Sequence, residues 1–258
     1  MEERTTVEKT GDRMSATHCL RGIIHCHSRF SYDSMIPISA YLRFAKQHSL
    51  DFVILTDHDT MAGSLALQEA AARHLPSLQV PLAAEYFTSE GDVIAAFLQR
   101  EIVGRDFARF KTEARQQGAL LLLPHPFVAH ASPETLAGEC DVIEVFNSRA
   151  SGDANQRALD LATKYKKPGF YGPDAHLSRS LHKAIIEVED CGGLRNSLLK
   201  GRLRCTSEEP TSKWEIGASQ LIKAVKSRDP YLATRVLRGG LRAAFRRSWA
   251  SQSPQDIH

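Results

Sequence analysis

The chain has 258 residues, of which 42% are hydrophobic and 24% are charged, and its formal net charge is +3. Such a composition is typical of a soluble globular protein. No apolar run is long enough to cross a bilayer, so we expect no membrane partner. The first residues lack the apolar segment of a secretory signal, which favours a cytoplasmic location. The five cysteines form no CxxC pair, which argues against a disulfide framework and against a cysteine-built zinc site.

Short apolar runs alternate with helix-like segments along the chain. The runs that we expect to form strands are residues 22–24, 52–55, 80–83, 93–97, 119–123, 142–145, 169–171 and 184–186. The segments with helical length and spacing are residues 38–48, 63–74, 106–117 and 155–164. Several of the strand runs are apolar throughout, as in parallel strands that are covered on both faces. The alternation predicts an α/β fold, either a barrel or a doubly wound sheet.

Ionisable and polar side chains follow the strand runs at their carboxyl ends. They are His25 and His27, Asp57 and His58, Glu85, His125, Asn147, and Asp174 and His176. Functional groups from many different strands converge at that end of a (β/α) barrel, whereas a doubly wound sheet gathers them from fewer strands. The pattern therefore favours the barrel.

The spacing of these residues points to bound metal. His25 and His27 are two apart on a strand, so their side chains share one face, and Asp174 and His176 repeat that spacing. So many imidazoles and carboxylates buried together without metal would be poorly solvated and mutually repelling. Mixed imidazole and carboxylate ligands suit Zn, Mn or Fe and fit Ca poorly.

Six short motifs in order give the chain a resemblance to a known family. They are His25-Cys26-His27-Ser28, residues 56–60 (Thr-Asp-His-Asp-Thr), Glu85 with residues 88–92, residues 124–127 (Pro-His-Pro-Phe), residues 144–149 (Glu-Val-Phe-Asn-Ser-Arg) and residues 172–176 (Gly-Pro-Asp-Ala-His). With these motifs the sequence resembles the PHP (polymerase and histidinol phosphatase) superfamily of metal-dependent phosphoesterases over residues 22–190.

The resemblance implies a distorted seven-stranded (β/α), TIM-like barrel with two or three divalent metal ions in a cleft. It implies that His25, His27 and Asp174 bind the first ion. Glu85 would bridge the first and second ions, and His125 would hold the second. By the same resemblance His58, His176 and Asp33 would hold the third.

The sequence departs from the family pattern at three places. Asp92 stands where several members have a histidine that follows the glutamate, and we keep Asp92 as a candidate ligand for the second ion. Pro173 replaces a common serine. His182 occupies a position that is commonly glycine, so we hold it as a candidate substrate-binding residue.

Clustered divalent ions suggest hydrolysis of a phosphate ester, because they bind phosphate, lower the pKa of a bridging water and stabilise the leaving oxygen. The resulting hydroxide would attack phosphorus in line. Asp57 is a candidate catalytic residue that would orient His58. Arg149 and Arg29 are candidates to bind phosphate oxygens through their planar guanidinium groups, and Asn147 is a further candidate substrate contact.

We expect three regions: a leader at residues 1–20, the barrel at residues 21–205 and a basic helical extension at residues 206–258. From residue 211 onward nine lysines and arginines face three acids. Residues 221–249 have the spacing of an amphipathic helix. That helix would pack on the barrel with a solvated basic face, or it would bind a polyanion such as RNA, DNA or an acidic lipid.

Three functions fit these patterns. The first is a phosphoesterase, such as a phosphatase, that acts on a small phosphorylated metabolite or a nucleotide. The second is a nuclease or exonuclease that cleaves phosphodiesters, for which the basic tail is the local support. The third is a non-catalytic binding module, which would predict broken ligand motifs, whereas the motifs here are nearly complete.

Overall fold

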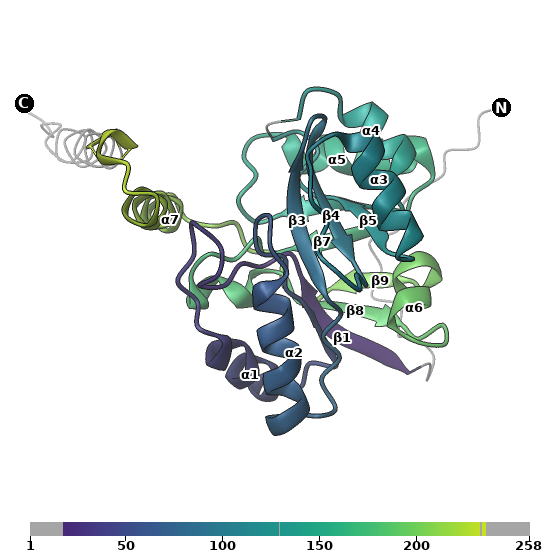
Figure 1. The fold of residues 1–258 in the computed structure, drawn as a ribbon. Helices are drawn as coiled ribbons and strands as arrows, with labels where there is room; N and C mark the ends of the chain where they lie inside the picture. The colour runs from purple at the N-terminus through teal and green to yellow at the C-terminus, as the bar shows by residue number, and fades with distance from the viewer. Residues whose placement is uncertain (1–17, 129, 233, 236–258) are drawn as a thin grey trace, which may run out of the picture.

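The computed structural model describes residues 18–128, 130–232 and 234–235 (Figure 1). Its strands are β1 (Cys19–Ile24), β2 (Phe52–Ile54), β3 (Ala83–Thr88), β4 (Gly91–Ala96), β5 (Leu120–Leu123), β6 (Val142–Asn147), β7 (Gly169–Gly172), β8 (Ile186–Glu189) and β9 (Leu203–Cys205). Its helices are α1 (Ile38–Gln47), α2 (Ala62–His74), α3 (Phe107–Gln116), α4 (Pro133–Glu139), α5 (Ala154–Tyr165), the 3₁₀ helix η1 (Ser178–Lys183), α6 (Leu194–Lys200) and α7 (Lys213–Lys226). The predicted α/β class is confirmed.

The strands form two sheets, with the orders β2-β1-β8-β9 and β3-β4-β5-β6-β7. Pairing is parallel between β1 and β2 and along β5, β6 and β7, and it is antiparallel elsewhere. Within the described residues the sheets are not closed into the expected seven-stranded barrel. They meet instead through the isolated bridges between His58 and Glu85 and between Cys26 and Ala175.

The prediction of alternating parallel strands was wrong in part because β3 and β4 are joined without a helical crossover. The turn at residues 89–90 connects β3 to β4 as an antiparallel hairpin. Such a hairpin needs only a short loop, whereas a parallel pair needs a crossover of a dozen or more residues. The strand expected at residues 80–83 begins at Ala83, so that Glu85 lies within β3 and not after it.

Buried apolar side chains of both sheets pack against one another in the interior. One cluster combines Ile24 of β1, Ile94 of β4 and Phe170 of β7, each fully buried. Helices α1 and α2 lie beside β1, and α3, α4 and α5 lie beside the five-stranded sheet (Figure 1). This packing brings the strand ends that carry the polar motifs to one side of the domain.

The prediction of a continuous helix at residues 221–249 was wrong in the part of that range that the structure describes. Helix α7 begins earlier, where Ser212 and Glu215 form a capping box, and it ends at Lys226. Arg228 has a φ of 54°, and a new helical segment begins at Pro230, a favourable first-turn residue. Residues 236–258 and the leader at residues 1–17 lie outside the described residues. In the ranges that are described, no helix is both long enough and apolar enough to span a membrane.

Candidate metal centre

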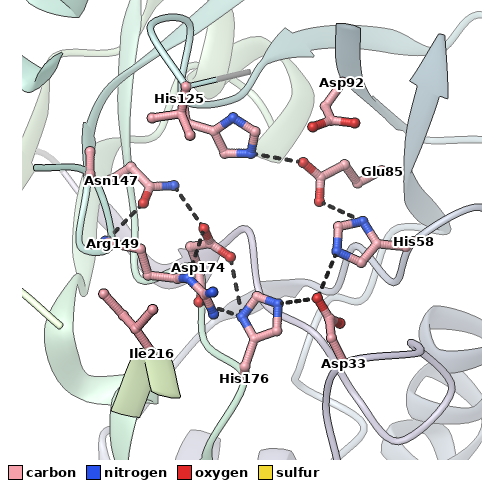
Figure 2. Close-up of a pocket in the computed structure, with 12 residues that line it drawn as sticks. Asp33, His58, Glu85, Asp92, His125, Asn147, Arg149, Asp174, His176 and Ile216 are labelled. Carbon is pink, nitrogen blue, oxygen red and sulfur yellow. Dashed lines mark hydrogen bonds and ion pairs between the residues drawn. The ribbon is translucent and has the colours of Figure 1, made fainter. Parts of the chain in front are cut away.

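A cavity of about 270 Å³ lies where strand ends from both sheets meet (Figure 2). It is lined by Asp33, His58, Glu85, Asp92, His125, Val128, Asn147, Arg149, Ala150, Asp174, His176 and Ile216. All of these except Val128, Ala150 and Ile216 were predicted as site residues from sequence. The three apolar residues were missed because apolar side chains in loops and helices carry no signal of their own.

His25 and His27 follow β1 and are fully buried beside the cavity. The Nε2 atom of each lies 3.4 Å from Glu85 Oε2. Asp174 Oδ1 lies 3.6 Å from His25 Nε2 and 3.4 Å from His27 Nε2. These two histidines and Asp174 form the first of three groups whose ligand atoms all lie within 4.8 Å of one another.

A second group consists of His25, Glu85 and His125. His125 Nε2 lies 3.1 Å from Glu85 Oε1, whereas the other carboxylate oxygen of Glu85 faces His25 and His27. Glu85 therefore stands between the first and second groups with one oxygen toward each.

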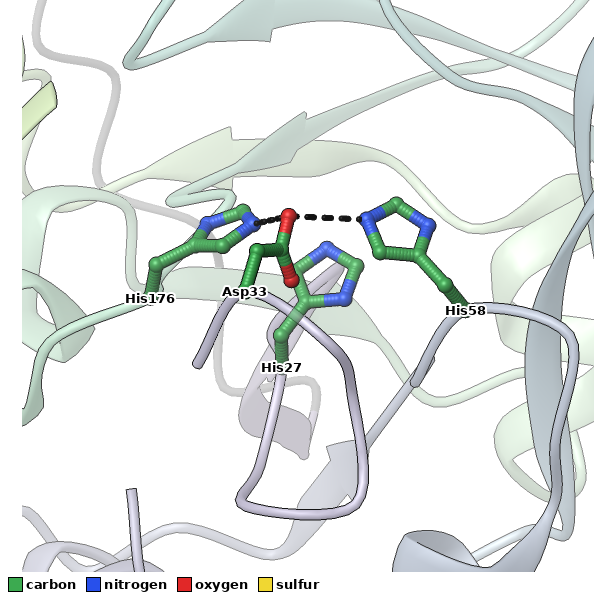
Figure 3. A group of neighbouring side chains, drawn as sticks. All are labelled: His27, Asp33, His58 and His176. Carbon is green, nitrogen blue, oxygen red and sulfur yellow. Dashed lines mark hydrogen bonds and ion pairs between the residues drawn. The ribbon is translucent and has the colours of Figure 1, made fainter. Parts of the chain in front are cut away.

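The third group consists of His27, Asp33, His58 and His176 (Figure 3). Asp33 Oδ2 lies 2.9 Å from His176 Nε2 and 3.3 Å from His58 Nε2. Asp33 comes from the loop between β1 and α1, and it reaches the same side of the domain as the two histidines. His25 belongs to the first and second groups, and His27 belongs to the first and third, so the three groups form one connected cluster.

Several buried atoms in this cluster have no hydrogen-bond partner among the described residues. They are His25 Nε2, both ring nitrogens of His27, Glu85 Oε2 and His125 Nδ1. Buried polar atoms normally find partners, so orphaned ones need an explanation. Ligand atoms about 2.0–2.2 Å from one ion lie roughly 3.0–3.5 Å apart, close to the spacings found here. The donor set therefore fits divalent metal.

The pKa values of Asp174 and His27 are both lowered within the cluster. Burial opposes ionisation, but His25 and Arg149 hold the pKa of Asp174 well below its usual range. Burial, together with His176 and His58, lowers the pKa of His27 to about 3. A neutral imidazole and ionised carboxylates are the protonation states that bind metal.

Glu144 of β6 supports the cluster and was missed as a functional residue. One of its oxygens accepts a hydrogen bond from His25 Nδ1 at 2.9 Å. The other accepts from the backbone N–H of His125 at 2.6 Å and from Asn147 Nδ2 at 3.0 Å. The signal in the sequence was an acid inside an apolar strand run, because a carboxylate is rarely buried unless it is paired.

The backbone at three of the candidate ligands lies in the left-handed region. The φ angles are 69° at His25, 26° at His125 and 42° at Asp174. Non-glycine residues adopt this region rarely, at a cost of about 1–3 kcal/mol each. Such strain persists only where surrounding contacts enforce it. Holding these three side chains in place therefore costs free energy in the local backbone.

Three candidate residues lie away from the cavity. Asp57 does not face His58, because its two oxygens accept hydrogen bonds from the backbone N–H (2.5 Å) and the hydroxyl (2.6 Å) of Ser28. The guanidinium of Arg29 lies over its neighbour Phe30, and His182 Nε2 lies 3.2 Å from the exposed Glu209. None of the three lines the cavity.

The candidates Asn147, Arg149 and Asp92 do line it. Asn147 Nδ2 donates to Asp174 Oδ2 at 3.2 Å, and Arg149 Nε lies 3.7 Å from the same oxygen. Asp92 is on the opposite wall, near Glu85 and His125 (Figure 2). Asp92 belongs to none of the three groups of ligand atoms.

The sequence matches two family models and two relatives. The model of the PHP domain matches residues 24–124, and the model of a PHP-associated region matches residues 152–203. Two uncharacterized proteins of Methanocaldococcus jannaschii are 26% identical over 160 residues and 33% identical over 118 residues. The alignments cover 56% and 41% of this chain, and 92% and 50% of the relatives.

A solved structure is similar over most of the chain. It is a two-domain protein from Bacteroides vulgatus, described as containing a predicted PHP-like metal-dependent phosphoesterase. The superposition has a TM-score of 0.63 at 18% identity and covers 80% of this chain and 70% of the other. At this identity the likeness establishes the fold. The two family matches include every residue of the three ligand groups except His125, which lies between them.

Proposed function

Because this chain belongs to the PHP family, we propose that it is a metal-dependent phosphoesterase that hydrolyses the phosphate ester of a small metabolite or a nucleotide. The observation that carries the proposal is the connected cluster of three ligand groups with orphaned buried atoms in one cavity. A non-catalytic binding module that had kept only the fold would have no reason to retain strained, buried ligands.

Two or three divalent ions of the Mn, Zn or Fe type fit this donor set. The residues that would hold them are His25, His27 and Asp174 for the first, Glu85 and His125 with the candidate Asp92 for the second, and Asp33, His58 and His176 for the third. When bound, such ions lower the pKa of a coordinated water and offset the charge of the phosphate oxygens.

The residues around the metal ligands would bind the substrate and orient the ligand side chains. Arg149 lines the cavity with its guanidinium beside Asp174, where it would bind a phosphate oxygen that does not react. Asn147 donates to Asp174 and to Glu144, which keeps the Asp174 carboxylate turned toward the cluster. Val128, Ala150 and Ile216 form an apolar part of the wall for the organic part of the substrate.

The size of the cavity favours a small substrate. Its volume of about 270 Å³ lies just below the range for small-molecule sites, roughly 300–1,000 Å³. Helix α7 contributes Ile216 to the wall and so limits the space beside the ligands. A phosphorylated metabolite or mononucleotide fits such a site better than a long nucleic acid does.

Removal of one ligand tests the proposal. Asp174→Ala should lose metal content and phosphate-ester hydrolysis together, when both are measured on the purified chain after loading with Mn²⁺. His74→Ala, at the exposed end of α2, should keep both. Substrates should include mononucleotides, a nucleoside bisphosphate and short RNA. Full hydrolysis by an Asp174→Ala protein that holds no metal would refute the proposal.

A further inference from the structure

Lys226, in the last turn of α7, binds the loop that follows β1 through main-chain carbonyl oxygens. Its Nζ donates to the carbonyl of Arg29 at 2.8 Å and to that of Ser34 at 3.0 Å, and it also donates to the carbonyl of Ser31. An ammonium group has three N–H donors, so these three carbonyls satisfy it completely. The residues joined are nearly 200 positions apart in the chain.

The loop at residues 28–36 carries Asp33 of the third ligand group. Its neck is closed by the hydrogen bond from Arg29 N to Ile36 O at 2.9 Å, and Ser31 N donates to Ser28 O at 3.0 Å. These bonds use carbonyls other than the three that Lys226 binds. Lys226 therefore adds contacts that the loop does not supply for itself.

Ser31 connects this lysine to two candidate metal ligands. Its carbonyl oxygen accepts from Lys226, and its hydroxyl donates to Asp33 Oδ1 at 3.0 Å. The same hydroxyl oxygen accepts from the backbone N–H of His58 at 3.3 Å. A displacement of Ser31 would thus move both Asp33 and His58.

A second lysine of α7 contacts the same loop. Lys223 Nζ lies 4.7 Å from the centre of the Tyr32 ring, within the range of a cation–π contact. The Tyr32 ring in turn stacks on the imidazole of His58, with centroids 4.7 Å apart and planes at 12°. Helix α7 therefore reaches the third ligand group by two routes.

We propose that Lys226 is a positioning residue for the third metal group, an inference that rests on the proposed function. By holding the carbonyl of Ser31, it keeps Asp33 and His58 at the spacing that a shared ion requires. The basic extension then serves the metal site of its own chain. Loss of residues that orient metal ligands typically weakens metal affinity by about 10–100-fold.

The direction of the effect separates positioning from charge. A lysine near a cation site repels the cation, so removing its charge by itself would strengthen metal binding. Positioning predicts the opposite, a weaker third site, when Lys226→Met keeps the length of the side chain and removes its donors. Lys213→Met, in the exposed first turn of α7, removes the same charge without these contacts.

The test is a titration of the metal-depleted full-length chain with Mn²⁺ by calorimetry, together with the count of bound ions after desalting. Lys226→Met should lose about one bound ion per chain, or bind its weakest ion about tenfold less tightly. Ser31→Ala should show the same loss, which provides a second variant if Lys226→Met folds poorly. Lys213→Met should match the wild-type chain.

Two results would overturn this inference and leave the proposed function standing. One is a Lys226→Met chain with the wild-type number of ions and wild-type affinities, even if its melting temperature falls. The other is an equal loss in Lys213→Met, which would show that the loss does not depend on the contacts that Lys226 makes with the loop. A wild-type chain that binds no divalent ion would instead refute the proposed function, and this inference with it.

Discussion

The Nδ1 atom of His25 lies 2.9 Å from Oε1 of Glu144, and neither side chain is exposed to solvent. A carboxylate that accepts from one ring nitrogen turns the other nitrogen toward the cavity and raises its basicity as a ligand. Burial lowers the pKa of His25, but Glu144, Asp174 and Glu85 outweigh it and raise that pKa well above its usual value. Glu144 is thus the support of the candidate metal centre.

Glu144→Gln should weaken metal binding about 10–100-fold with little change in the fold. The glutamine cannot accept from His25 and from the His125 backbone N–H with two equivalent oxygens. Metal affinity is measured by titration of the depleted protein. Glu134→Gln, at an exposed position of α4, should leave the affinity unchanged. Gly172→Ala should resemble Glu144→Gln, because the added Cβ would lie 1.9 Å from Glu144 Oε1.

Asp57→Asn should reduce stability and leave catalysis mainly intact. The Asp57 carboxylate is fully buried, and its two oxygens accept hydrogen bonds from the backbone N–H and the hydroxyl of Ser28. In Asp57→Asn the side-chain NH₂ group would face one of these donors of Ser28. The expected loss is about 1–3 kcal/mol in the free energy of unfolding, measured with denaturant. Ser28→Ala should show a smaller loss of the same kind. A fall of kcat by 10²-fold or more in a folded, metal-loaded Asp57→Asn protein would instead indicate acid–base chemistry.

The docking of α7 should depend on pH through Glu215. Burial opposes ionisation of this carboxyl, but hydrogen bonds from Ser212 and Ser180 and the charge of Lys183 lower its pKa from 4.5 to about 2. A lowered folded-state pKa stabilises the protein above the unfolded value, and that stabilisation is lost as the pH falls toward 2. The melting temperature of the wild-type chain should therefore exceed that of Glu215→Gln at neutral pH. The difference should narrow between pH 4.5 and pH 2, and a constant difference would contradict this assignment.

Ile216→Trp should narrow the cavity and change selectivity. Ile216 is the residue of α7 that lines the cavity, so a larger side chain there takes space from the substrate and not from the ligands. The value of kcat/KM should fall more for a mononucleotide than for a small alkyl phosphate, with metal content unchanged. Leu221→Trp, at an exposed position of the same helix, should leave both values as they are. Equal loss for both substrates would argue against Ile216 as part of the substrate wall.

The ligands could be predicted because they follow strands whose apolar character is visible in the sequence. His25, His58 and His176 come at such ends, and strand ends gather on one side of an α/β domain whether or not its sheets close. The pattern did not distinguish a closed barrel from two sheets. That difference depends on hydrogen bonds between distant strands and on the β3–β4 hairpin, which looked like two separate runs.

Residues that act through other residues were harder to predict. Asp57 was expected to orient its neighbour His58, but a side chain at a strand end turns to either face, and that of Asp57 turns to Ser28. Lys226 looked like one charge among many in a basic tail, because its carbonyl partners lie nearly 200 residues away. Long-range contacts of this kind leave no periodic signal in a single sequence.

The dependence of phosphate-ester hydrolysis on metal tests the central claim most directly. The purified chain is depleted with a chelator, and Mn²⁺ is returned in steps while bound ions and hydrolysis are measured on the same samples. We expect no hydrolysis by the depleted chain, and a rate that rises with ions bound at the cluster and reaches its maximum when the cluster is full. Equal hydrolysis by the depleted and the loaded chain would contradict the claim.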